Sequence, residues 1–153
     1  MKKNKSFAEK AYRYTRIDAG MTQRRIEDML AELGISNIRI TRIGSDYTVE
    51  FIAQLKRDEH PRKVRMNIPI DSDLGEDDKS QERQKNKIFR VLYWHLKSKF
   101  VSVQNGLKEF EAEFLDDIVI IHNGKEMRIG DVMVPEIKRQ LMGSDRVLIN
   151  ITK

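Results

Sequence analysis

The chain has 153 residues, of which 39% are hydrophobic and 35% are charged, and this composition is typical of one soluble globular domain with a heavily charged surface. It contains no cysteine, which excludes disulfides, thiolate nucleophiles and cysteine-ligated zinc. The net charge of +5 favours polyanionic partners, such as nucleic acid or acidic protein surfaces.

Residues 1–20 are basic, and we expect them to form a partly flexible arm ahead of a single domain over 21–153. The arm begins with positive charge, but the apolar run of a secretory signal does not follow. Nowhere do about eighteen apolar residues follow one another, as a membrane-spanning helix needs. We therefore expect a cytoplasmic protein without membrane contact.

Residues 21–34 predict a helix that Thr22 caps and Gly34 ends, because apolar residues recur there at helical spacing. Three segments with alternating apolar residues follow, at 37–44, 46–55 and 62–70. Turn-forming residues separate them. The segments therefore predict a meander of three antiparallel strands with one face packed against helices.

An acidic, solvated loop is predicted over 71–78. It resembles a calcium loop, but Gly75 stands at a ligand position and the closing glutamate is missing, so we expect no metal there. The following segment, 79–115, contains no proline and only one glycine, Gly106. Its apolar residues recur every three or four positions: Leu92, Leu96, Phe100, Val103, Leu107, Phe110 and Phe114. This stripe predicts one long helix over 79–115, or two helices joined near Gly106.

The C-terminal part predicts a hairpin and a helix. Residues 117–121 predict a short buried strand, and Asn123-Gly124 is the pair that favours a type I′ turn. A last helix is expected over 131–142 with Pro135 in its first turn.

Residues 146–151 are apolar enough to add a final strand. Together the elements predict an α+β fold: an N-terminal helix, a three-stranded antiparallel sheet, a long central helix, and a C-terminal β-hairpin and helix.

The charge of the chain is polarised around the predicted long helix. Between Lys79 and Lys108 eight cations stand against one acid, Glu82, so the segment carries eight minus one, or +7. Five carboxylates lie in 71–78 and five more in 109–117. The basic segment is therefore the candidate for contact with a polyanion.

Trp94, the only tryptophan, is predicted to point away from the main apolar face. With about 100° per residue and Leu92 at zero, the stripe spans about 0° to 80°, whereas Trp94 lies near 200°. Arg90, Lys97 and Val101 lie beside it, at about 160°, 140° and 180°. An aromatic ring among cations is typical of a nucleic-acid surface or of a protein–protein hot spot. The alternative is a second buried face formed by Trp94 and Val101.

Other candidate chemistry is weaker. The histidines His60, His95 and His122 lie in different elements without metal-binding spacing, and His95 is expected to border the apolar stripe. Asp116 and Asp117 could hold a divalent metal in a nuclease, which we keep as a third hypothesis. No glycine-rich phosphate loop occurs. We expect no cofactor, no metal and no enzymatic activity.

Two stretches, KIFRVLYWHLKSKFVSVQNGLKEFEAEFL (87–115) and DDIVIIHNGKEMRIGDVMVPEI (116–137), resemble a family of short uncharacterised proteins encoded by bacteriophages and prophages. The matching residues are Arg90, Leu96, Lys97, Lys99, Phe100, Val103, Gly106, Phe110, Glu111, Phe114, Leu115, Gly124, Gly130, Pro135 and Ile137. Phe89 departs from a tryptophan of the family pattern, and Asp116 departs from a proline. The resemblance implies a phage or prophage origin and no active site.

We therefore expect a non-enzymatic phage or prophage accessory protein that binds nucleic acid, single- or double-stranded, in DNA replication or recombination. Its expected contact residues are Lys87, Arg90, Trp94, Lys97 and Lys108. The alternative is a protein-interaction or inhibitor module that acts on a host or phage protein, for example against host defence. Self-association is left open.

Overall fold

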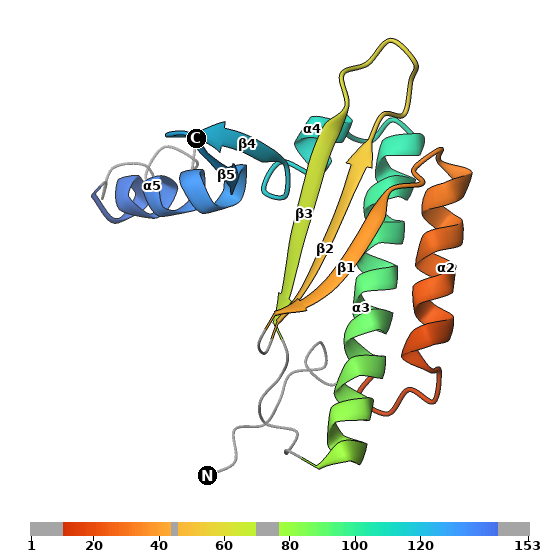
Figure 1. Ribbon diagram of the computed structural model, residues 1–153. Coiled ribbons are helices and arrows are strands. Elements are labelled where there is room, and N and C mark those ends of the chain that lie inside the picture. The colour runs from red at the N-terminus through yellow and green to blue at the C-terminus, as the bar shows by residue number, and fades with distance from the viewer. Residues whose placement is uncertain (1–10, 44–45, 70–76, 144–153) are drawn as a thin grey trace, which may run out of the picture.

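The computed structural model describes residues 11–43, 46–69 and 77–143. A three-stranded sheet is covered on one face by two helices that lie side by side, while a hairpin and the last helix lie beyond the edge of the sheet (Figure 1). The elements are α2 (Ala19–Glu32), β1 (Ile38–Ile43), β2 (Asp46–Ala53), β3 (Arg62–Pro69), α3 (Asp78–Gln104), α4 (Phe110–Glu113), β4 (Val119–His122), β5 (Lys125–Arg128) and α5 (Ile129–Gly143). This order confirms the predicted α+β fold class. The predictions for 1–10, for residues 71–76 of the acidic loop and for 146–151 lie outside the described residues.

The sheet is the predicted meander, with antiparallel strands in the order β1-β2-β3. Val49 of β2 stands opposite Ile40 of β1 and Met66 of β3. Because side chains alternate along a strand, most apolar residues of the three strands share one face, and α2 and α3 cover that face. Ile43 and Ile52 are the exceptions and are exposed. The sheet therefore has one buried face and one open face.

Helix α2 begins earlier than the sequence predicted. Its N-cap is Asp18, whose carboxylate accepts a hydrogen bond from the Gly20 backbone N–H (2.8 Å). The prediction that Thr22 is the cap is wrong: Thr22 lies inside the helix and is fully buried. The end at Gly34 is confirmed, since Gly34 has a φ of +77° and the Ile35 N–H reaches back to the Leu30 carbonyl (2.9 Å).

Helix α3 also begins and ends differently from the prediction. Asp77, expected in the acidic loop, caps the helix by accepting the Ser80 backbone N–H (2.9 Å), and Asp78 is its first residue. The helix ends at Gln104, and Gly106 follows with a φ of +70°. The alternative of two helices joined near Gly106 is therefore the correct one, and the single helix over 79–115 is wrong.

Aromatic packing joins the sheet to α3 and α4. The Phe100 ring of α3 lies 6.1 Å from Phe51 of β2 and 5.1 Å from Phe114. Phe114 in turn stacks on Phe110 at 4.5 Å. Leu107, the remaining member of the predicted stripe in this region, is 76% exposed because the chain has left the helix there.

The hairpin has the predicted turn, since Asn123 and Gly124 both have positive φ, as a type I′ turn requires. The prediction that 117–121 is a buried strand is wrong: only its start is buried, and Ile121 is 70% exposed. Pro135 lies inside α5, in the second turn instead of the first. The outer part of β4 is exposed because the hairpin lies beyond the edge of the sheet.

The open face of the sheet carries an ion network around Glu50, which is buried although it lies on this side. Its carboxylate accepts hydrogen bonds from Arg39 Nε and Arg65 Nε, both at 2.8 Å. Lys63 and Arg65 also donate to Glu126 of β5, at 2.8 and 2.9 Å. The network thus ties the hairpin to all three strands.

Burial raises the pKa of Glu50, but hydrogen bonds from Arg39 and Arg65 outweigh it and hold the pKa below the ordinary value. We predict that Glu50→Gln lowers the free energy of unfolding by about 1–2 kcal/mol at neutral pH. A carboxylate with a depressed folded pKa stabilises above its unfolded pKa, about 4.3, and loses that contribution as pH falls through the folded value. The difference between the two proteins, measured by urea unfolding, should therefore shrink below about pH 4. A difference that is independent of pH would contradict this role.

Candidate nucleic-acid interface

The outer face of α3 is exposed, while its inner face is in the core. Leu92, Leu96 and Phe100 are at most 3% exposed. Trp94 and Val101, on the opposite side, are 41% and 49% exposed. The alternative in which Trp94 and Val101 form a second buried face is therefore wrong, and Trp94 is a surface residue.

Trp94 is part of a cluster of two aromatic rings and two cations, which we call the α3 aromatic cluster: Arg90, Tyr93, Trp94 and Lys97. The Tyr93 and Trp94 rings meet edge to face at 5.3 Å. The Arg90 guanidinium lies 5.4 Å from the Tyr93 ring and 5.7 Å from the Trp94 ring. The Lys97 ammonium lies 5.7 and 5.1 Å from the same two rings. Positions 90, 93, 94 and 97 follow helical spacing, so one face of α3 brings all four together.

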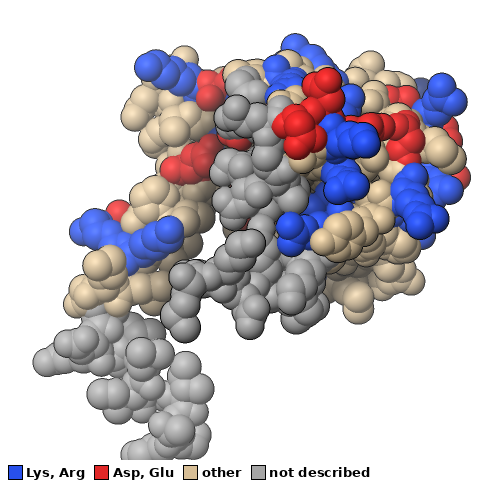
Figure 2. All heavy atoms as spheres, turned by 90° about the horizontal axis from the view of Figure 1, so that it is seen from below, with Lys and Arg blue, Asp and Glu red and all other residues tan. Residues whose placement is uncertain are grey.

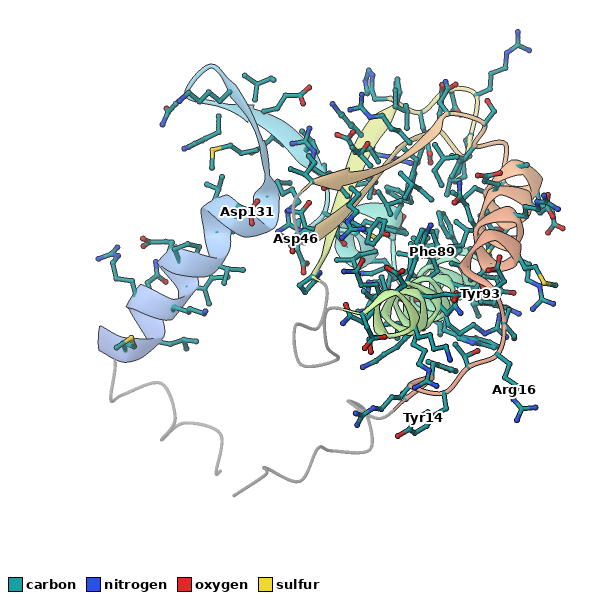
Figure 3. All side chains as sticks on the ribbon, turned by 60° about the horizontal axis from the view of Figure 1, so that its bottom comes forward. Tyr14, Arg16, Asp46, Phe89, Tyr93 and Asp131 are labelled. Atoms are coloured by element: carbon teal, nitrogen blue, oxygen red, sulfur yellow. The ribbon has the colours of Figure 1, made fainter. Side chains whose placement is uncertain are left out.

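Tyr93 was not among the predicted contact residues. At about 100° from Leu92 it stands between the apolar stripe and Trp94, and this intermediate angle is the signal that could have identified it. Its side chain is half-buried and points towards α2, whereas Phe89, one turn earlier, points into the core (Figure 3). Tyr93 therefore links the core to the exposed Trp94.

Arg90 is partly buried beside the two rings. Its Nη1 is buried and, among the described residues, has no hydrogen-bond partner. The aromatic faces offset the cost of enclosing the cation, because the ring quadrupole attracts positive charge. The other N–H groups of the guanidinium are left for solvent or a ligand.

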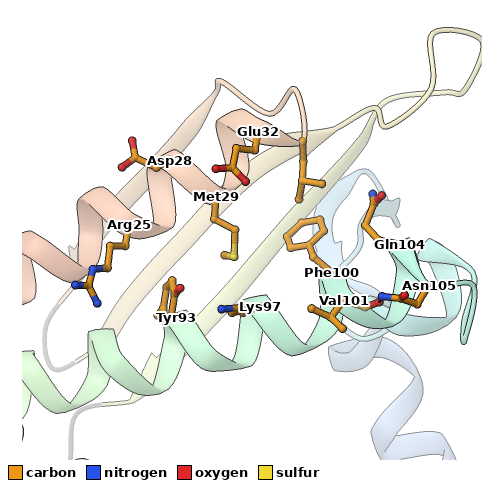
Figure 4. A pocket seen from close by; sticks show the side chains of 11 residues that line it. Arg25, Asp28, Met29, Glu32, Tyr93, Lys97, Phe100, Val101, Gln104 and Asn105 are labelled. Atoms are coloured by element: carbon orange, nitrogen blue, oxygen red, sulfur yellow. The ribbon is translucent and has the colours of Figure 1, made fainter.

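A groove of about 510 Å³ runs between α2 and α3 beside this cluster. Tyr93 and Lys97 line its α3 side, and Met29 reaches across from α2 (Figure 4). Two acids, Asp28 and Glu32, and one cation, Arg25, line the α2 side. These carboxylates would repel a phosphate backbone, so the groove itself is a poor path for nucleic acid.

The cations of the basic segment divide into two groups. At the C-terminal end of α3, Lys99 donates to the Glu113 carbonyl (2.6 Å), and the Lys108 ammonium lies 3.7 Å from the Glu113 carboxylate. Among the described residues, no acid pairs with Arg83, Lys85, Arg90 or Lys97. The acidic segment 109–117 thus offsets the end of the basic segment and leaves its earlier part positive.

Four of the five expected contact residues share one face of α3. Lys87, Arg90, Trp94 and Lys97 all lie on the outer face, within about 80° of one another around the axis. Lys108 does not, because α3 ends before it and its partner Glu113 also contacts Lys99, which lies about 140° from Trp94. The structure therefore removes Lys108 from the predicted face.

The cations do not form a continuous patch on the face seen in Figure 2. Lysine and arginine side chains there are interspersed with aspartate and glutamate. The aromatic cluster is therefore the more distinctive feature.

Asp116 and Asp117, the two acids considered as metal ligands, lie in different surroundings. Burial raises the pKa of Asp117, whose carboxylate lies 3.5 Å from the Arg128 guanidinium. Asp116 next to it is exposed. Over the described ranges, no group of three or more histidine, aspartate or glutamate side chains could hold a metal ion.

The loss of stability in Trp94→Ala should show whether Trp94 is a surface residue or a core residue. We predict a loss of about 1 kcal/mol or less in the free energy of unfolding, because the ring is half-exposed. Phe100→Ala, the matched substitution on the inner face, should cost about 3–5 kcal/mol. Chemical denaturation of both variants measures this, and equal losses would show that Trp94 belongs to the core.

Comparisons with protein-family models, curated proteins and solved structures found no match. Within the described residues, no helix is long and apolar enough to cross a membrane.

Proposed function

We propose that the protein binds single-stranded nucleic acid through the outer face of α3. The observation that carries the proposal is the α3 aromatic cluster, in which the half-exposed Trp94 stands between Arg90 and Lys97. A tryptophan offers a face on which any base can stack, and adjacent cations neutralise phosphates. Neither base stacking nor phosphate neutralisation requires base-specific hydrogen bonds, so we expect little sequence preference.

The length of the cationic face sets the expected number of phosphate contacts. Arg83, Arg90 and Lys97, which pair with no acid among the described residues, lie along about 21 Å of the helix, at about 1.5 Å per residue. Three cations in one row should release about two counterions from a single strand, at about 0.7 per phosphate. The salt dependence of binding is therefore moderate and can be measured.

A single strand fits this surface better than a duplex. The flat face of a base is available for stacking only when the base is unpaired. The cations, moreover, lie along one helix and are bordered by the acids of α2. These features favour a flexible strand that can turn its bases towards Trp94.

The biological setting is part of the proposal. Single strands are exposed during DNA replication and recombination, and we propose a non-enzymatic accessory role there for a protein of phage or prophage origin. A protein-interaction module is the alternative, because a tryptophan beside an arginine is also typical of binding hot spots. The binding experiment below distinguishes the two.

We predict that a labelled oligodeoxythymidine binds with a slope of log K against log salt of about −2. Lys97→Ala should make this slope shallower by about 0.7, and Lys108→Ala should leave it unchanged. Trp94→Ala should weaken binding about 5- to 150-fold at constant slope, since stacking on one base contributes about 1–3 kcal/mol. Fluorescence anisotropy at several salt concentrations measures all three.

Lys108→Ala is the matched control, because it removes one lysine from the same basic segment but from outside the proposed face. Equal effects of the two lysine substitutions would show nonspecific attraction to the whole chain. No binding at low salt would reject the proposal. Tighter binding to a duplex that does not depend on Trp94 would reject the single-strand assignment.

A further inference from the structure

The groove between α2 and α3 has an apolar floor and a charged rim. Four side chains that pack in or against the core form the apolar part: Met29, Leu33, Tyr93 and Phe100. The volume of about 510 Å³ is in the range of sites that take a small molecule. The groove is therefore large enough for one nucleobase, and its floor offers apolar surface to the face of the ring.

The charges on the rim balance one another. Two acids, Asp28 and Glu32, stand against two cations, Arg25 and Lys97. A groove with balanced charges suits a neutral polar ligand better than a free ion. The acids disfavour a phosphate, whereas a nucleobase is uncharged and carries hydrogen-bond donors and acceptors on its edge.

Glu32 is the acid that can receive such an edge. Its carboxylate turns into the groove, whereas that of Asp28 turns away from α3 (Figure 4). Among the described residues, Glu32 has no ion pair and accepts no hydrogen bond. Arg25 stands seven residues earlier, about 10 Å along the axis of α2. Both carboxylate oxygens of Glu32 are therefore available to a ligand.

We propose that this groove binds a guanine base, next to the base that stacks on Trp94. Guanine presents two adjacent donors on its base-pairing edge, the N1–H and the N2 amino group, and a carboxylate accepts such a pair with its two oxygens. Adenine and cytosine present one amino donor beside an acceptor nitrogen. Thymine presents one N–H between two carbonyl oxygens, which a carboxylate repels. Guanine is thus the base that Glu32 binds best.

This inference rests on the proposed function and makes it more specific. Tyr93 and Lys97 belong both to the α3 aromatic cluster and to the wall of the groove, so the two sites adjoin. A strand whose phosphates lie along α3 can place one base on Trp94 and the next base in the groove. Stacking on Trp94 gives little sequence preference by itself. The preference for guanine is therefore confined to one nucleotide.

Short strands that differ in one base test the proposal. By fluorescence anisotropy, an oligodeoxythymidine with one central guanine should bind the full chain about 5- to 10-fold more tightly than oligodeoxythymidine itself. This is the low end for a bidentate contact, because Glu32 is exposed. Inosine at the same place lacks only the N2 amino group, and the inosine strand should bind about 2- to 3-fold less tightly than the guanine strand.

Glu32→Ala should abolish the preference for the guanine strand over the thymine strand, because it removes both acceptor oxygens. Glu27→Ala is the matched control, since it removes the same charge from α2. Glu27 lies about 140° from Glu32 around the axis, and its carboxylate accepts a hydrogen bond from Gln23 Nε2 (3.0 Å). The preference should therefore remain in Glu27→Ala.

The outcomes separate this inference from the proposed function. Equal affinity for the guanine, inosine and thymine strands, with binding that still depends on Trp94, would overturn the guanine site and leave the proposed function standing. A guanine preference that survives Glu32→Ala, or that Glu27→Ala removes equally, would overturn its assignment to the groove. No binding of any strand at low salt would reject the proposed function and the guanine site together.

Discussion

The contact of Phe100 with Phe51 and Phe114 fixes how α3 sits on the sheet, and the rest of the molecule depends on it. Phe100 lies in line with Leu92 and Leu96, so the same contact sets the rotation of the whole helix about its axis. Once those residues face the sheet, a side chain about half a turn away must face outward. Trp94 is exposed for this reason, and the α3 aromatic cluster is a consequence of the core.

The same packing decides which cations remain available. Phe110 and Phe114 hold α4 against the end of α3, and this brings Glu113 to Lys99 and Lys108. The positive segment of the sequence is thus divided in the fold, with its later part paired to acids. What remains positive is the row that surrounds Trp94, and the proposed function follows from that division.

Periodicity in the sequence predicted the order of the elements and the orientation of Trp94, because both depend on local geometry. The sequence left two alternatives for the end of α3, since only packing decides whether a helix continues past Gly106. The assignment of Lys108 failed for that reason: extending one helix to 115 placed it on a face that the chain never forms. The exposure of Ile121 was also unpredictable, because an apolar strand is buried only if another element covers it.

Trp94 is the only tryptophan of the chain, so its own fluorescence reports directly on the central claim that this ring is a nucleic-acid contact. Titration of the unmodified protein with an unlabelled single-stranded oligonucleotide should quench and shift the emission to saturation, because a base stacks on the ring. Added salt should reverse the change. An emission spectrum that stays constant while anisotropy shows the strand bound would contradict the account, since binding would then occur away from Trp94.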